Sequence, residues 1–332
     1  MRSTAKLVRR LALATALAAA VTACSSQGGA QQEQAGGGGG TGGTVGTERY
    51  TVAMVTHEAP GDTFWDRIRA GAEDAAAAHN IELRYSNNNQ APEMATLVQN
   101  AIDSQVDGLA VTLAYPEQVG PVAKAAADRG IPVVAFNAGL DQYEQYGAKM
   151  YFGSDETLAG RAAGERLAKA GAQKAICVIQ EQGHVALEAR CAGVKATFPN
   201  TENLYVQGTD TAQVRSTIGA KLQEDTSVTH IVTLSAPVAL TALESVRDAG
   251  SQAKVATFDL NVDAAKAIQE GNILFSINQQ PYVQGYMSVA SLWLNLTNGN
   301  DIGGGGPVLT GPSFVDETNI EQIITYAQNN KR

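Results

Sequence analysis

Residues 128–137, DRGIPVVAFN, and residues 248–259, DAGSQAKVATFD, repeat one local pattern that decides the fold. In each segment a helical stretch ends at a glycine, an apolar run follows, and an aromatic residue precedes Asn137 or Asp259. Glycine commonly follows a helix C-terminus, and a short apolar run is typical of a buried strand. The repeat therefore indicates two similar α/β lobes. Ligands of open α/β sheets bind beyond the carboxyl ends of the strands, so Asn137 and Asp259 are expected to face a cleft.

The alternation of strand and helix extends along the chain. Ala-rich segments with helical spacing, such as the one beginning at Phe64, separate short apolar runs. Nearly continuous apolar strands are typical of parallel sheets covered by helices on both faces. The predicted fold class is α/β with doubly wound parallel sheets. The predicted strands are 50–55, 81–85, 108–113, 132–136, 175–179, 204–206, 230–234, 255–258 and 273–277.

The first 47 residues predict export and a tether. Four basic residues precede an apolar run at 11–21, which has the length of a signal-peptide core and is too short to span a bilayer. Residues 21–24, VTAC, resemble a bacterial lipobox, which implies cleavage after residue 23 and a diacylglyceryl group on Cys24. The alternative is an ordinary signal peptide (1–23) with a chance cysteine. Residues 24–47 are mostly Gly, Gln, Ser and Thr, as in a flexible linker, which favours the lipoprotein.

Charge and cysteine content limit the partners and the compartment. Removing residues 1–23 takes away four positive charges and no acidic residue, so the net charge changes from −9 to −13. A surface this acidic argues against binding to nucleic acid or anionic lipid. Cys177 and Cys191 remain after lipidation of Cys24. An oxidising compartment favours a disulfide between them over two buried free thiols.

The chain lacks the motifs of common enzyme classes. It has no G-x-S-x-G, Walker A, C-x-x-C or H-E-x-x-H sequence, and the glycines at 303–306 lack the strand-to-helix context of a phosphate loop. The histidines and cysteines do not have metal-ligand spacing. No catalytic residue, cofactor or metal is therefore predicted.

Six segments together resemble the ribose- and galactose-type (type I) periplasmic binding proteins, the sugar receptors of ABC importers. The resemblance implies two Rossmann-like lobes joined by a three-strand hinge, with the ligand between them. Lobe 1 would comprise 48–153 and 280–310, and lobe 2 would comprise 154–279 and 311–332. The segments are 52–68 (VAMVTHEAPGDTFWDRI), 130–139 (GIPVVAFNAG), 152–160 (FGSDETLAG), 188–193 (EARCAG), 255–259 (VATFD) and 276–281 (SINQQP).

The resemblance also implies a set of ligand-binding residues. Aromatic rings pack against the C–H face of a sugar, while a carboxylate and a guanidinium bind its hydroxyls. Five of the positions have a structural alternative: the two aromatic residues as core, the two aspartates as helix N-caps, and the arginine as a solvated charge. The predicted site is Asp62, Phe64, Trp65, Asn137, Arg190, Ser235, Asp259 and Gln279.

Departures from the family pattern bear on the ligand. Asn137-Ala138 replaces an Asp-Arg pair of the ribose receptors, an aromatic residue is replaced near Thr211, and Ser235 replaces an asparagine. Unpaired hydroxyls in a closed cleft cost about 1–3 kcal/mol each, which disfavours ribopyranose. A pentose, a hexose, a furanose and a cyclic or linear polyol stay open. Loop residues at the strand ends that could supply the missing partners are His57, Glu58, Tyr115, Glu181, Gln182 and His184.

These features predict a monomeric, lipid-anchored receptor on the outer face of the cytoplasmic membrane, which passes a sugar or polyol to an ABC permease. The anchor would be its only membrane contact. A co-receptor for a membrane sensor kinase is the alternative. A sugar-sensing repressor is disfavoured, because a signal peptide and linker stand where its DNA-binding helices would be.

Overall fold

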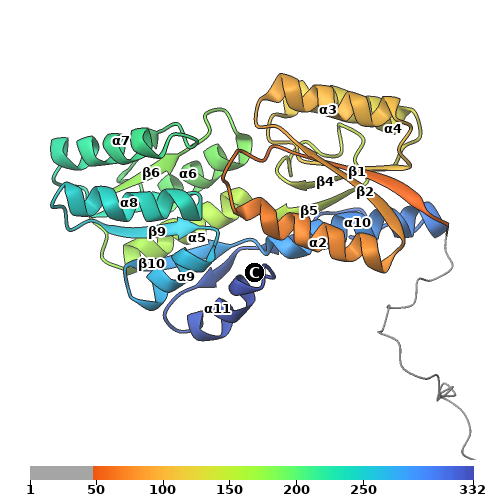
Figure 1. Ribbon diagram of the computed structural model, residues 1–332. Coiled ribbons are helices and arrows are strands. Elements are labelled where there is room, and N and C mark those ends of the chain that lie inside the picture. Colours follow the sequence, from red (N-terminus) through yellow and green to blue (C-terminus); the bar gives the residue numbers. More distant parts are fainter. Residues whose placement is uncertain (1–47) are drawn as a thin grey trace, which may run out of the picture. The chain divides into compact units, whose positions relative to one another are not determined.

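A computed structural model describes residues 48–332, so the predicted signal peptide, Cys24 and the tether lie outside the described residues. The first sheet has the strand order β11-β5-β4-β3-β1-β2, with parallel pairing throughout. Helices α3 (Ala91–Asp103) and α4 (Pro116–Asp128) cover one face, and α2 (Phe64–Ala78) and α10 (Pro281–Asn298) cover the other (Figure 1). The strands are β1 (Tyr50–Thr56), β2 (Ile81–Asn87), β3 (Gly108–Val111), β4 (Val133–Asn137), β5 (Met150–Ser154) and β11 (Val308–Gly311).

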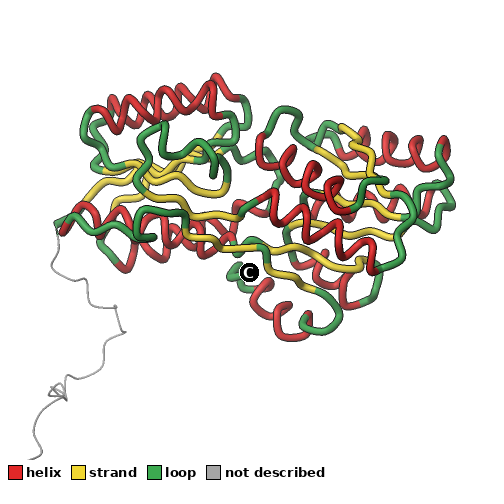
Figure 2. Tube along the Cα trace, turned by 180° about the vertical axis from the view of Figure 1, so that it is seen from behind, coloured by secondary structure: helices red, strands yellow, loops and turns green. Residues whose placement is uncertain are grey.

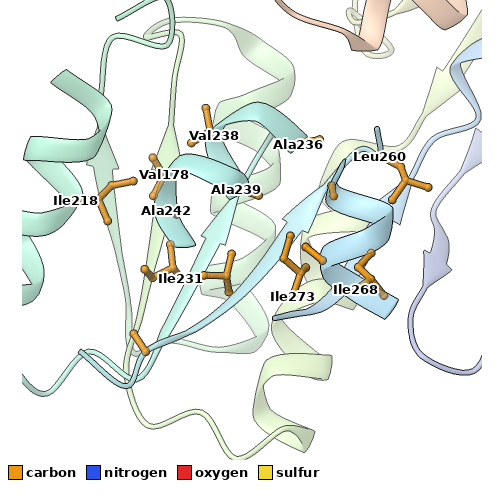
Figure 3. Close-up of a cluster of buried hydrophobic side chains, with 14 of the residues drawn as sticks. Val178, Ile218, Ile231, Ala236, Val238, Ala239, Ala242, Leu260, Ile268 and Ile273 are labelled. Carbon is orange, nitrogen blue, oxygen red and sulfur yellow. The ribbon is translucent and has the colours of Figure 1, made fainter. Parts of the chain in front are cut away.

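The second sheet has the order β12-β10-β9-β8-β6-β7. One face is covered by α5 (Glu156–Lys169) and α6 (Val185–Thr197). The other packs against α7 (Thr211–Glu224), α8 (Ala236–Asp248), α9 (Val262–Gln269) and α11 (Ile320–Gln328), through the aliphatic core drawn in Figure 3. The strands are β6 (Ala175–Ile179), β7 (Thr201–Tyr205), β8 (His230–Thr233), β9 (Lys254–Phe258), β10 (Ile273–Asn278) and β12 (Ser313–Val315).

The chain passes between the two sheets three times. It leaves β5 of the first sheet for α5, returns from β10 to α10, and crosses again from β11 to β12. In each lobe the strands run between two layers of helices (Figure 2). The predicted class of two doubly wound α/β lobes with three crossings is therefore confirmed.

The sheets differ from the prediction at the edge strands β11 and β12 and at β5, which lies between β11 and β4. β5, β11 and β12 were not among the predicted strands, and β12 pairs antiparallel with β10. β11 and β12 have only four and three residues, too few for a clear apolar pattern. An antiparallel edge strand is common on an otherwise parallel sheet.

Cys177 on β6 and Cys191 on α6 are joined by a disulfide in the structure. Both side chains are fully buried in the apolar cluster between the second sheet and its helices. The bond ties α6 to the sheet, and α6 is the helix that carries Arg190.

Each lobe contains one helix pair whose close approach depends on glycine. A Cβ atom on Gly71 of α2 would lie 2.1 Å from the Tyr282 carbonyl oxygen of α10, and one on Gly160 of α5 would lie 2.1 Å from the Arg190 carbonyl oxygen of α6. Such distances leave no space for a methyl group. The backbone of Arg190 is thus held against α5 by a contact that only glycine permits.

We expect Gly160→Ala to destabilise the protein and to weaken ligand binding, because α6 must move away from α5 and carry Arg190 with it. Forcing a methylene into a packed contact costs about 1–3 kcal/mol. The matched control is Gly219→Ala, because Gly219 lies inside α7 and a Cβ atom added there would meet no other atom within 4 Å. That change should be neutral or stabilising by up to about 1 kcal/mol. Urea unfolding of both variants checks the prediction, and equal stabilities would contradict it.

Candidate ligand-binding cleft

All eight predicted site residues line one cavity between the lobes. The first lobe contributes Asp62, Phe64, Trp65 and Asn137, the second contributes Arg190, Ser235 and Asp259, and Gln279 lies at the second crossing. The other lining residues are His57, Gln180, Glu181, His184, Ala186, Leu187 and Leu234.

Asp259 follows the last residue of β9 and is 94 % buried. Its Oδ1 accepts a hydrogen bond from Gln279 Nε2 at 2.7 Å, and its Oδ2 lies 3.8 Å from Arg190 Nη1. Burial raises the pKa of Asp259 to about 7, against the opposing effects of Arg190 and Gln279. Asp259 is not the cap of the next helix, because Asn261 accepts the Ala264 N–H there.

Arg190 is also buried, which contradicts its alternative role as a solvated charge. Its Nε and Nη2 donate to the two carboxylate oxygens of Glu156 at 2.6 and 3.1 Å, and its Nη1 donates to the Leu234 carbonyl at 3.3 Å. The guanidinium also lies over the Phe258 ring, 4.7 Å from its centre. Arg190 therefore faces the cavity as a fixed cation with much of its donor capacity already used.

A buried amide network connects the cavity to the crossings. Asn137 Nδ2 donates to Gln284 Oε1 at 3.1 Å and to Gln279 Oε1 at 3.4 Å, and Gln284 Nε2 donates to Thr310 Oγ1 at 3.0 Å. Asn137 and Asp259 both have left-handed backbones, with φ of 65° and 62°. Such backbones are uncommon outside glycine and cluster at functional sites. The two equivalent strand ends thus share a strained geometry at the cavity.

Phe64 and Trp65 both belong to the first-lobe core and also line the cavity. Their rings meet edge to face with centres 5.2 Å apart, and Trp65 meets His57 in the same way at 4.7 Å. The core and site interpretations of these two residues are therefore compatible. The three rings give the first lobe an apolar wall beside its polar groups.

Asp62 combines a structural and a cavity-facing position. Its Oδ1 accepts the Phe64 N–H at 3.0 Å at the start of α2. Burial raises the pKa of Asp62 to about 6. Ser235 precedes α8 without a side-chain cap bond and also lines the cavity. Both side chains keep oxygens available to a ligand.

His57 and His184 connect the lobes through a chain of hydrogen bonds. The Ala186 N–H donates to His184 Nδ1, so the proton of His184 is on Nε2, which lies 2.8 Å from His57 Nε2. His57 then donates from Nδ1 to Thr112 Oγ1 at 2.7 Å. Burial lowers the pKa of His184 to about 3 and lowers that of His57 well below its usual value. Both rings are therefore neutral.

The cleft has an inner and an outer part. The inner cavity described above has a volume of about 30 Å³, which suits a water molecule and not a sugar ring. The outer hollow has about 500 Å³ and shares Asp62, Gln180, Glu181 and Ser235 with it. At its rim, Tyr115 of the first lobe donates to Glu181 of the second at 3.1 Å. A sugar ring therefore does not fit into the inner cavity in this arrangement of the lobes.

The sequence interpretation missed several residues that line the cavity. It also missed Glu156, which accepts two hydrogen bonds from Arg190. Gln180 and Leu234 follow β6 and β8, so the strand-end rule that identified Asp259 would also have identified them. Glu156 lies in a quoted segment, but it looks like an ordinary acid in the first turn of a helix. Of the loop residues proposed as additional partners, Glu58 instead binds Arg69 and Tyr85 within the first lobe.

We expect ligand affinity to fall as the pH is lowered from 8 to 5. Burial raises the pKa values of Asp62, Glu181 and Asp259 to about 6, 7 and 7, so these carboxyls gain protons in this range. Hydrogen bonds to an ionised carboxylate are stronger than neutral ones by about 1 kcal/mol, so the loss should be roughly tenfold or more. Calorimetry across this range checks it. His184, with a pKa of about 3, does not titrate there, and a pH-independent affinity would contradict the prediction.

None of the helices in residues 48–332 has the length and apolarity needed to cross a membrane.

The comparisons with known proteins agree with this geometry. Residues 52–301 match the periplasmic binding protein domain family. A solved carbohydrate transporter from Acidothermus cellulolyticus, in complex with myo-inositol, is 50% identical, covers 86% of this chain and 100% of its own, and superposes with a TM-score of 0.85. The xylose/arabinose-binding protein of Sulfolobus acidocaldarius is 22% identical, over 79% of this chain and 70% of its own length. The xylitol-binding protein of Mycolicibacterium smegmatis is 23% identical, over 80% and 78%.

These three relatives are named as transport or binding proteins, which agrees with the absence of enzyme motifs in the sequence. The family match covers both lobes and all eight predicted site residues. The chain therefore belongs to the periplasmic binding protein family, of the type I class that the sequence resembles.

Proposed function

We propose that this protein binds a small polyol in the cleft between its lobes, and that a cyclic polyol of the inositol type is preferred to a pentose or hexose. The observation that carries the proposal is the cavity in which carboxylate, guanidinium and amide groups from both lobes meet an aromatic wall. Such a lining suits a ligand with apolar C–H faces and hydroxyls at its edge. The 50% identical relative solved with myo-inositol supports the cyclic polyol.

A thermal-shift panel tests the ligand class. A ligand at 100 times its Kd stabilises the folded protein by about 2.7 kcal/mol, which moves the unfolding midpoint measurably. We expect myo-inositol to give a larger shift than ribose, xylose, galactose or xylitol. If only a pentose or hexose shifts the unfolding midpoint, that sugar and not a cyclic polyol is the ligand. No shift from any member, confirmed by calorimetry, would contradict polyol binding.

We propose further that a lipid on Cys24 anchors the mature chain to the outer face of the cytoplasmic membrane. The support is the basic segment, the short apolar run and the lipobox-like VTAC at 21–24. Replacing Cys24 by Ala should move the protein from the membrane fraction to the soluble fraction. Unchanged fractionation would refute the anchor.

The anchored receptor is proposed to act as a monomer and to deliver its ligand to an ABC permease, in keeping with its family. Deletion of the receptor gene should abolish uptake of the radiolabelled ligand. Uptake that persists, together with loss of ligand-induced gene expression, would favour the alternative role as a co-receptor for a sensor kinase.

A further inference from the structure

Several hydrogen-bond donors that line the inner cavity are already used within the protein. The Nδ2 group of Asn137 donates to Gln284 and Gln279, and the Nε2 group of Gln279 donates to Asp259. Arg190 donates three hydrogen bonds to Glu156 and Leu234. The two histidine protons are used in the chain from His184 through His57 to Thr112. Most N–H groups of these five side chains are therefore already used within the protein.

Acceptors, in contrast, remain free. Asp259 Oδ2 accepts no hydrogen bond in the described chain, and its nearest cationic nitrogen is 3.8 Å away. Gln180 lines both parts of the cleft, and its Oε1 is buried without a hydrogen-bond partner among residues 48–332. Within the same residues, the Glu181 carboxylate accepts only the Tyr115 hydroxyl, and that of Asp62 only the Phe64 N–H. A ligand must therefore bring donors.

The charges in the cleft are also unbalanced. Asp62, Glu181 and Asp259 line it, and Arg190 is the one Lys or Arg among the described residues that line either part. Arg190 is already paired with Glu156, which lies outside the lining. Arg67, buried just outside the lining, interacts electrostatically with Asp62 and Asp259 but forms no salt bridge with either among the described residues. The three carboxylates of the lining thus outnumber its one cation.

Two of these carboxylates belong to opposite lobes. Asp62 is in the loop between β1 and α2, and Glu181 is in the loop between β6 and α6. Both line the inner cavity and the outer hollow, so they flank the passage from one to the other. Beside the effect of burial, the negative charge of Asp62 raises the pKa of Glu181, because like charges repel. A cation between them would remove this repulsion and would bind both lobes.

We propose that the passage between Asp62 and Glu181 is a subsite for a protonated amine. The cleft then prefers an aminocyclitol or amino sugar to the parent polyol without the amine. It rejects polyols that carry a carboxylate or a phosphate. This inference rests on the proposed polyol-binding function. An ammonium group brings three donors and a positive charge to a place rich in acceptors and negative charge. A carboxylate or phosphate there would face like charges at short range.

Calorimetry on the unmodified protein at pH 7.5 tests the subsite with two matched series. The first is myo-inositol, 1-amino-1-deoxy-myo-inositol and myo-inositol 1-phosphate, and the second is glucose, glucosamine and glucuronate. In the series that binds, we expect the amine to bind at least tenfold more tightly than the parent, and the anion at least a hundredfold more weakly. An amine that binds no better than its parent would overturn the inference and leave polyol binding intact. Failure of every polyol to bind would overturn the proposed function itself.

Variants locate the subsite. Glu181→Gln and Asp62→Asn should each lower the ratio of amine to parent affinity at least threefold. The matched control is Glu224→Gln, an exposed acid on α7 away from the cleft, which should leave the ratio unchanged. An amine preference that survives in both cleft variants would overturn the placement of the ammonium between these two carboxylates.

Discussion

Replacing Asp259 by Asn should weaken binding of the polyol about a hundredfold while leaving the fold as stable as before. The free Oδ2 is the acceptor that a ligand hydroxyl can reach, and an amide NH2 in its place is a donor facing Arg190. A hydrogen bond to a charged group contributes about 1.5–3 kcal/mol, and about 2.7 kcal/mol corresponds to a hundredfold change in Kd. Calorimetry with the ligand identified in the thermal-shift panel gives the affinity.

Asparagine is the better test than alanine because of the backbone. Asp259 has a φ of 62°, a region that Asn tolerates far better than Ala, so Asp259→Ala would add strain to the loss of the acceptor. The raised pKa of Asp259, about 7, means that its ionisation opposes folding of the empty protein at pH 8. The Asn variant should therefore melt at the same temperature or higher. Unchanged affinity in a stable Asp259→Asn protein would remove Asp259 from the site.

The sequence predicts those parts of the site that depend on local pattern. Asn137 and Asp259 end equivalent apolar strands, and the structure gives them matching left-handed backbones. Parallel strands bring their carboxyl ends to one edge, so position along the chain was enough to place both side chains at a cleft.

What the sequence does not predict depends on contacts between distant segments. Glu156 and Arg190 are 34 residues apart, and nothing in either helix shows that the two side chains meet. The link between His57 and His184 spans 127 residues and exists only because the lobes close. The short edge strands β11 and β12 are stabilised by pairing with β5 and β10, which local propensity does not register.

Replacing Arg190 by Met should cause the largest loss of stability of any change in the cleft. Arg190 and Glu156 form a bidentate ion pair in which both side chains are over 90 % buried. The Asp259 carboxylate lies 3.8 Å from the same guanidinium. Removing one partner of a buried pair typically costs about 3–5 kcal/mol, because the other charge stays buried without compensation. We expect a loss of this size in urea unfolding at pH 8, together with loss of ligand binding.

A second substitution distinguishes the stability lost with the ion pair from the stability lost with the packing of Arg190. In the double variant Arg190→Met with Glu156→Gln, the carboxylate left behind at position 156 becomes a neutral amide, so the part of the stability loss that comes from this unpaired charge should return. Ligand binding should not return, because the cavity still lacks its cation and Asp259 keeps no counter-charge. If the double variant is as unstable as Arg190→Met alone, the arginine acts mainly through its packing on Phe258 and between α5 and α6. If it regains both stability and affinity, Arg190 has no direct role toward the ligand.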